Sequence, residues 1–295
     1  MFPRPDRIIV PQYAPPAALS VIAGAELLGE SKRAVAAALV DLAVRGMLGV
    51  TRGAARRDGF GLQLRTVPAD DGTASVRDDL AVLTAVFPRL QPGARMSLTP
   101  TTRRALGQRL RTAHREAVAR LVAGGLVQQR GVLEKAIVFW RKQPTVPTPR
   151  AHPYIDHLWG VHDYIAWAEA DRLAFHQSPT GAAVRELDGT ALLHLHERLL
   201  PYAVLFGLET QWMRELSVRF EVARAELGDL VDGVDTLVHV AALSGDVAQL
   251  VSDVHELAEL PDLADLGSIV ELGEVADGIG AFFGGLGEFI GGIDF

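Results

Sequence analysis

The sequence predicts a mainly α-helical protein with small β-wings, in which tandem winged-helix-like units precede an all-α helical domain. Two observations carry this prediction. The order helix, helix, short hairpin occurs twice in the first half of the chain, and the second half has helical periodicity alone. The predicted parts are unit 1 at residues 1–70, unit 2 at 71–142, a proline-rich linker at 143–151, an acidic helical domain at 152–277 and a tail rich in glycine and phenylalanine at 278–295.

Unit 1 begins with two helices and ends in a hairpin. A short helix over residues 20–28 is ended by Gly29, and Ser31 is a suitable N-cap for the second helix. Residues 48–52 and 60–67 flank a basic turn, and the alternating leucines of the second segment indicate a strand. These two segments predict the wing of unit 1.

Both faces of the second helix of unit 1 are apolar. One face supplies a core stripe of Val35, Leu39, Leu42 and Met47. The opposite face, where a DNA-reading helix needs polar side chains, offers Ala36, Ala37, Val40 and Val44. A helix that is apolar nearly all round is a buried helix. We therefore expect this helix to pack against protein and not to read DNA.

Unit 2 differs, because its long helix carries a basic stripe. Helices are expected over residues 76–87 and, after a threonine cap, over about 100–124, with a wing formed by residues 126–129 and 136–140. On the long helix, side chains at helical spacing form a stripe of Arg103, Arg104, Gln108, Arg111 and Arg115. Arginine forks suit phosphates and carboxylates, so these five are the candidate anion-binding residues.

The acidic domain is predicted to be helical, with one surface for association. Helices are expected over residues 159–175, 192–199 and 210–227. Farther on, apolar residues recur at alternating intervals of three and four, as in a heptad seam: Val240, Leu243, Val247, Leu250, Val254 and Leu257. This seam is the candidate surface for self-association or for a protein partner.

The two halves of the chain have opposite charge. The whole chain carries a formal charge of −7. Residues 1–150 contain 23 Lys and Arg against 11 Asp and Glu, a net +12, whereas residues 151–295 contain 6 Arg, no Lys and 25 Asp and Glu, a net −19. One interpretation is that the basic half binds an anionic partner. The other is that the two halves bind each other, or that their charges are simply solvated.

Composition excludes several classes of protein and of site. With no cysteine, the chain has no disulfides, no thiolate metal sites and no cysteine nucleophile. No apolar run reaches the roughly 18–20 residues of a membrane span. The first residues lack the apolar segment of a secretory signal. We therefore expect a cytoplasmic location, with association to a membrane surface left open.

No pattern of catalytic or metal-binding residues stands out. His152, His157 and His162 recur every five residues, but five residues on a helix turn by about 500°, so their side chains diverge. The sequence has no nucleophile elbow, phosphate-binding loop, zinc-protease motif or dinucleotide fingerprint. We expect no metal, no cofactor, no small-molecule substrate and no enzymatic activity.

Three segments resemble a known family. They read VPQYAPPAALS (Val10–Ser20), LVDLAVRGMLGV (Leu39–Val50) and ERLLPYAVLFGLETQW (Glu197–Trp212). In this order they are similar to the YciQ-like predicted membrane proteins, a bacterial family with a domain of unknown function. The helix WGVHDYIAWAEADRL (Trp159–Leu173) resembles the one that precedes the family's Leu-Pro-Tyr-Ala motif.

The resemblance implies a relation to the cytoplasmic part of these proteins alone. Family members carry an export signal, an extracytoplasmic β-rich domain and transmembrane helices, which have no counterpart in this sequence. Where relatives have a transmembrane hairpin, this chain has the proline-rich linker. The family implies no catalytic residues.

Two functions from different classes follow. The first is a non-enzymatic cytoplasmic scaffold or adaptor, which binds protein partners through the winged-helix units and the seam. The second is binding of nucleic acid, or of an anionic membrane surface, through the basic half, with the acidic half masking it.

Overall fold

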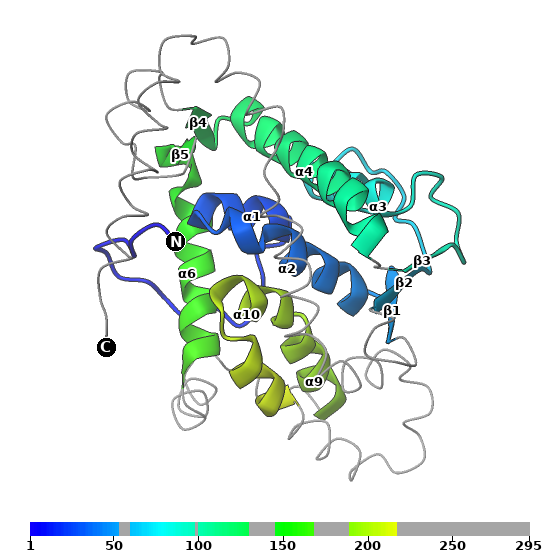
Figure 1. Cartoon of the computed structure of the whole chain (residues 1–295). Helices are drawn as coiled ribbons and strands as arrows, with labels where there is room; N and C mark the ends of the chain where they lie inside the picture. Colours follow the sequence, from blue (N-terminus) through cyan, green and yellow to red (C-terminus); the bar gives the residue numbers. More distant parts are fainter. Residues whose placement is uncertain (53–59, 98–99, 130–144, 168–188, 217–295) are drawn as a thin grey trace, which may run out of the picture. The chain divides into compact units, whose positions relative to one another are not determined.

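The structure, a computed structural model of the whole chain, describes residues 1–52, 60–97, 100–129, 145–167 and 189–216. They all belong to one compact unit, residues 1–259, of the two into which the chain divides. The helices are α1 (Val21–Leu28), α2 (Ser31–Val44), α3 (Ala74–Val86), α4 (Pro100–Ala123), α6 (His152–Ala166), α9 (Gly189–Glu197) and α10 (Leu200–Phe206), and a 3-10 turn spans Pro149–Ala151 (Figure 1). The strands are β1 (Leu48–Arg52), β2 (Phe60–Leu64), β3 (Arg95–Ser97), β4 (Val127–Gln129) and β5 (Thr145–Pro147). The expected mainly helical fold with small antiparallel sheets is confirmed.

Helix α1 lies at the centre of the described residues. All eight of its residues are buried, and it contacts α2, α4, α6 and α10. Gly29 ends the helix as predicted, with a φ of 73°, whereas Ser20, expected as the first helical residue, is its N-cap, whose hydroxyl accepts a hydrogen bond from the Ala23 amide at 3.2 Å. The prediction that Ser31 caps the second helix was wrong, because Ser31 is the first residue of α2 and its hydroxyl donates to Glu26. Because α1 is apolar almost throughout, burial on every side is its stable arrangement.

The small sheets join segments that the sequence analysis assigned to different units. Strands β1 and β2 form the predicted antiparallel hairpin, and β3, which lies between α3 and α4, pairs with β2. Strand β4 pairs with β5, which lies in the proline-rich segment. The expected wing strand at residues 136–140 lies outside the described residues. The tandem winged-helix arrangement is therefore not confirmed.

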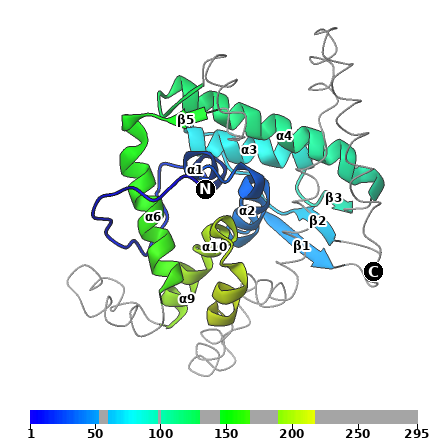
Figure 2. The same cartoon turned by 60° about the vertical axis from the view of Figure 1, so that its left-hand side comes forward.

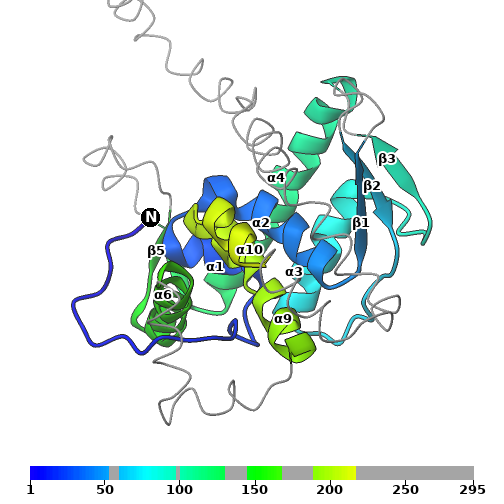
Figure 3. The same ribbon diagram turned by 90° about the horizontal axis from the view of Figure 1, so that it is seen from below.

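The apolar outer face of α2 is covered by α10 of the acidic half. Ala36, Ala37 and Val40 are 1%, 0% and 4% exposed, and α10 lies beside α2 in two views (Figures 1 and 3). The Arg33 guanidinium donates to the carbonyl of Val204 in α10 at 2.9 Å. The expectation that α2 packs against protein is confirmed, and the protein that it packs against is its own chain.

The N-terminal segment runs along α6 and joins the two oppositely charged halves (Figure 2). Arg4 forms two hydrogen bonds with Asp163, at 2.7 and 2.6 Å, and Arg7 pairs with Asp156 at 2.5 Å. The Gln12 amide donates to the carbonyl of Gly160 at 3.0 Å. These contacts support the interpretation that the two halves bind each other.

A buried carboxylate, Glu26 of α1, links four elements. It is 3% exposed and accepts hydrogen bonds from the hydroxyls of Ser31 in α2, at 2.8 Å, and of Thr145 in β5. Nε2 of His114 in α4 lies 3.4 Å from its Oε2, an ion-pair distance. Burial raises the pKa of Glu26, but the nearby ring of His114 and the hydrogen bonds from Thr145 and Ser31 together outweigh it, so the pKa lies below its ordinary value.

Candidate functional site

Helix α4 carries the predicted anion-binding stripe on its outer face. It packs along α3 (Figures 1 and 2) through a buried apolar stripe of Leu106, Leu110, Ala113, Ala117 and Leu121. On the other face, Gln108 and Arg115 are exposed and Arg111 is partly exposed. The structure therefore brings these three residues to one accessible surface, which we call the α4 basic face. The backbone of Arg103 and Arg104 belongs to the same helix, but their side chains lie outside the described residues.

The α4 basic face has a strong local excess of positive charge. The helix contains six arginines and one glutamate. One arginine, Arg120, is structural, because its Nε donates to the buried Asp78 of α3 at 2.6 Å. Among the described residues, the Arg115 guanidinium donates to the hydroxyl of Thr112, one turn earlier in the same helix, at 3.2 Å. The guanidinium of Arg115 thus remains accessible to an external anion.

The second predicted site cannot be placed. The seam residues Val240 to Leu257 lie outside the described residues, so its role in association stays a prediction. Within the described ranges, no group of three or more His, Cys, Asp or Glu side chains is close enough to hold a metal ion. No described helix is long and apolar enough to cross a membrane.

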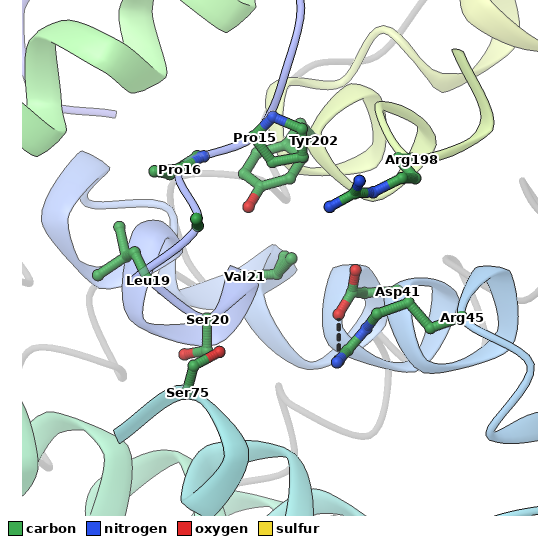
Figure 4. Close-up of a pocket in the computed structure, with 11 residues that line it drawn as sticks. Pro15, Pro16, Leu19, Ser20, Val21, Asp41, Arg45, Ser75, Arg198 and Tyr202 are labelled. Atoms are coloured by element: carbon green, nitrogen blue, oxygen red, sulfur yellow. Dashed lines mark ion pairs between the residues drawn. The ribbon is translucent and has the colours of Figure 1, made fainter. Parts of the chain in front are cut away.

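The structure also contains a polar pocket that the sequence analysis missed. It has a volume of about 100 Å³ and lies between the segment Pro15–Val21, α2, the start of α3 and the turn from α9 to α10 (Figure 4). Asp41 projects toward it from α2, Arg198 from the turn between α9 and α10, and Tyr202 from α10. No spacing rule could have joined them, because Asp41 is far from the other two in sequence.

Asp41 sits in a charged environment at this pocket. Its carboxylate pairs with Arg45 at 2.5 Å, and Arg45 also pairs with Asp79 of α3 at 2.8 Å. Burial, the largest cause, raises the pKa of Asp41 to about 6, although Arg45 lowers it. Burial also raises the pKa of Tyr202 above its ordinary value. The Tyr202 hydroxyl is therefore a hydrogen-bond donor at any physiological pH.

A buried carboxyl group next to the pocket predicts an unusual pH dependence of stability. Glu197 is 4% exposed, and its described contact is Nδ1 of His194 at 3.3 Å. Burial raises the pKa of Glu197 from 4.5 to about 7. Because the folded state favours the protonated carboxyl, this stabilising contribution is complete below pH 4.5 and is lost as the pH rises through about 7.

We expect Glu197→Gln to stabilise the protein at high pH alone. At pH 8 the free energy of unfolding should rise by about 1–3 kcal/mol, because the amide cannot ionise, whereas at pH 5 it should change little. Urea unfolding at both pH values measures this. The matched control is Glu116→Gln on the exposed face of α4, which should have a small effect at either pH. The same change in both variants, or no pH dependence, would contradict the burial argument.

Comparison with known proteins assigns no family. No protein-family model matches the chain, and neither a curated protein nor a solved structure is significantly similar to it. The resemblance to the YciQ-like proteins thus stays a prediction from the sequence. The function must be argued from the residues themselves.

Proposed function

We propose that this chain is a non-enzymatic binding protein that holds the phosphate backbone of nucleic acid on the α4 basic face. One observation supports this proposal above the others: Gln108, Arg111 and Arg115 share the accessible side of a helix whose other side is buried. Arginine forks match phosphate oxygens, and glutamine can also contact base edges.

Three carboxylates of the acidic half pair with arginines that lie outside α4. In the described part of the acidic half, Asp156, Asp163 and Glu209 pair with Arg7, Arg4 and Arg33, all of which belong to other segments. The self-association of the two halves thus involves the N-terminal segment and α2. Among the contacts between described residues, it does not use Arg115.

The winged-helix interpretation is part of the proposal. We interpret α3, β3 and α4 as the core of a winged-helix-like unit, with α4 as its recognition helix. The packing of α3 on α4 and the strand between them support this. The corresponding helix of unit 1, α2, cannot take that role, because α10 covers its outer face.

The scaffold hypothesis has weaker support. It was based on the apolar face of α2 and on the seam at residues 240–257. The face of α2 is occupied by α10, so it offers nothing to a protein partner. The seam alone remains as its basis.

The test is the salt dependence of DNA binding by the full chain. Binding that neutralises Z phosphates has a log–log slope against salt of about −0.9Z. We expect wild-type protein to bind a fluorescent duplex with a steep slope in anisotropy titrations at several salt concentrations. The double variant Arg111→Ala/Arg115→Ala should bind more weakly, with a slope reduced by about 2.

The control variant removes the same amount of positive charge from sites outside α4. Arg89→Ala/Arg214→Ala removes two exposed arginines that do not belong to α4, and its slope should equal that of the wild type. A flat salt response, or equal slopes for all three proteins, would reject the proposal. If the α4 variant instead loses binding to phosphatidylserine vesicles while DNA does not bind, the partner is a membrane surface and the nucleic-acid proposal is wrong.

A further inference from the structure

We propose that the pocket between α2 and the α9–α10 turn binds the carboxylate group of a small molecule, held by Arg198 and Tyr202 beside Asp41. This site is separate from the α4 basic face. The ligand-binding proposal can therefore be tested independently of the nucleic-acid proposal.

The size of the pocket limits the class of ligand. A buried water needs about 10–15 Å³ of such volume, so the pocket of about 100 Å³ has room for a molecule of a few heavy atoms. A nucleotide or a peptide is too large. The prolines at positions 15 and 16 form one wall, which is rigid because each ring fixes its backbone φ (Figure 4).

Of the hydrogen-bond donors that line this space, the proposal depends on those of Tyr202 and Arg198. Tyr202 is 2% exposed, and its hydroxyl points toward the cavity without a hydrogen bond to any described residue (Figure 4). Because this oxygen faces the open space of the pocket, a ligand oxygen could accept a hydrogen bond from it in place of water. The Arg198 guanidinium extends into the same space and forms no ion pair with a described side chain. A neutral donor and a charged fork together suit a carboxylate.

The surroundings of Asp41 distinguish between two kinds of carboxylate. The charged groups that face Asp41 are Arg45 on its own helix, Asp79 from α3 and Arg198 from the α9–α10 turn. The ionised Asp41 repels a simple anion but attracts an ammonium group. An amino acid would place its ammonium toward Asp41, whereas a plain carboxylic acid would use Arg198 and Tyr202 alone.

The experiment is a titration of the full chain with acetate and with glycine. Saturation-transfer NMR at pH 7.5 should show saturable binding, with a Kd of about 0.1–10 mM for ligands this small. Tyr202→Phe removes one oxygen and keeps the ring, and it should weaken binding about tenfold. Arg198→Gln should weaken it by roughly tenfold to a hundredfold. The control Arg214→Gln, at another exposed arginine, should bind like the wild type.

A second titration at pH 5.5 separates the two ligands. The pKa of Asp41 is raised to about 6 by burial, so its carboxyl is mostly protonated at pH 5.5. Acetate should then bind more tightly, and glycine less tightly if its ammonium faces Asp41. Tighter binding of glycine than of acetate at pH 7.5 assigns the site to an amino acid, and the reverse assigns it to a simple carboxylate.

The proposal fails under either of two results. One is the absence of saturable binding of both probes up to roughly 100 mM. The other is binding that neither variant changes. Because Arg198 is exposed, Arg198→Gln keeps the test decisive even if Tyr202→Phe disturbs folding. Neither result bears on the α4 basic face.

Discussion

Substitution of Gly160 by alanine is expected to displace the N-terminal segment from α6. A Cβ atom at position 160 would overlap the carbonyl oxygen of Val10 and lie 2.8 Å from Cγ and 3.2 Å from the backbone nitrogen of Gln12. The first of these neighbours is backbone, so it cannot yield by changing a rotamer. We expect a loss of about 1–3 kcal/mol in the free energy of unfolding. Hydrogen exchange of residues 1–14 should accelerate, because the Gln12 amide loses its bond to the carbonyl of Gly160.

Gly24 provides a matched control within another buried helix. A Cβ atom there would lie 3.5–3.6 Å from the side chains of Leu158 and Leu19, which is ordinary van der Waals contact. Gly24→Ala should therefore be neutral, or stabilise by up to about 1 kcal/mol through helix propensity. If both variants behave alike, or if exchange of residues 1–14 is unchanged in Gly160→Ala, the close approach of the N-terminal segment to α6 is not as described.

Because the N-terminal segment docks on α6, DNA binding by the basic half must be measured in the full chain and not in a fragment. A fragment of residues 1–150 lacks α6 and α10, so it would expose the apolar face of α2 and leave Arg4 and Arg7 unpaired. Such a fragment could bind DNA through arginines that the intact chain uses internally. Only the full chain separates the α4 basic face from these structural arginines.

Local patterns in the sequence were enough to predict most of the described helices in the first half. Gly29 marks the end of α1, and the alternating leucines of β2 indicate a strand, because each signal depends on neighbouring residues. The two apolar faces of α2 indicated burial, which the structure confirms. The residues of α2 alone were enough to predict its burial.

Long-range pairing was not predictable in the same way. Strand β5 was interpreted as a proline-rich linker, but its residues pair with β4 because an extended chain next to an open strand edge can add to it. Helix α6 begins at His152, well before the expected start at residue 159, since Pro153 is tolerated in a first turn. It ends at Ala166, before the expected end at residue 175, because Trp167 has an extended backbone. The pocket was missed for a similar reason: Asp41 and Tyr202 meet only after α10 packs on α2.

Loss of the carboxylate of Glu26 is expected to be among the most destabilising changes in the described residues. Glu26→Gln keeps the shape of the side chain but removes its negative charge. The hydroxyls of Ser31 and Thr145 and the nearby ring of His114 then face a neutral amide inside the core. We expect a loss of about 2–4 kcal/mol in the free energy of unfolding at pH 7, measured by urea denaturation. The control Glu30→Gln, at a side chain 21% exposed that pairs with the N-terminal amine, should cost about 1 kcal/mol or less.

The pH dependence of this loss tests its electrostatic origin. The pKa of Glu26 lies below 4.5 in the folded state, so the carboxylate stabilises the fold fully above pH 4.5 and loses this effect as the pH falls through the lowered pKa. The difference between wild type and Glu26→Gln should thus be constant from pH 7 to pH 5 and shrink toward pH 3.5. A difference that persists unchanged at pH 3.5 would assign the effect to packing. The link between α1, α2, α4 and β5 would then depend on apolar contacts alone, because the shared charge would contribute nothing measurable.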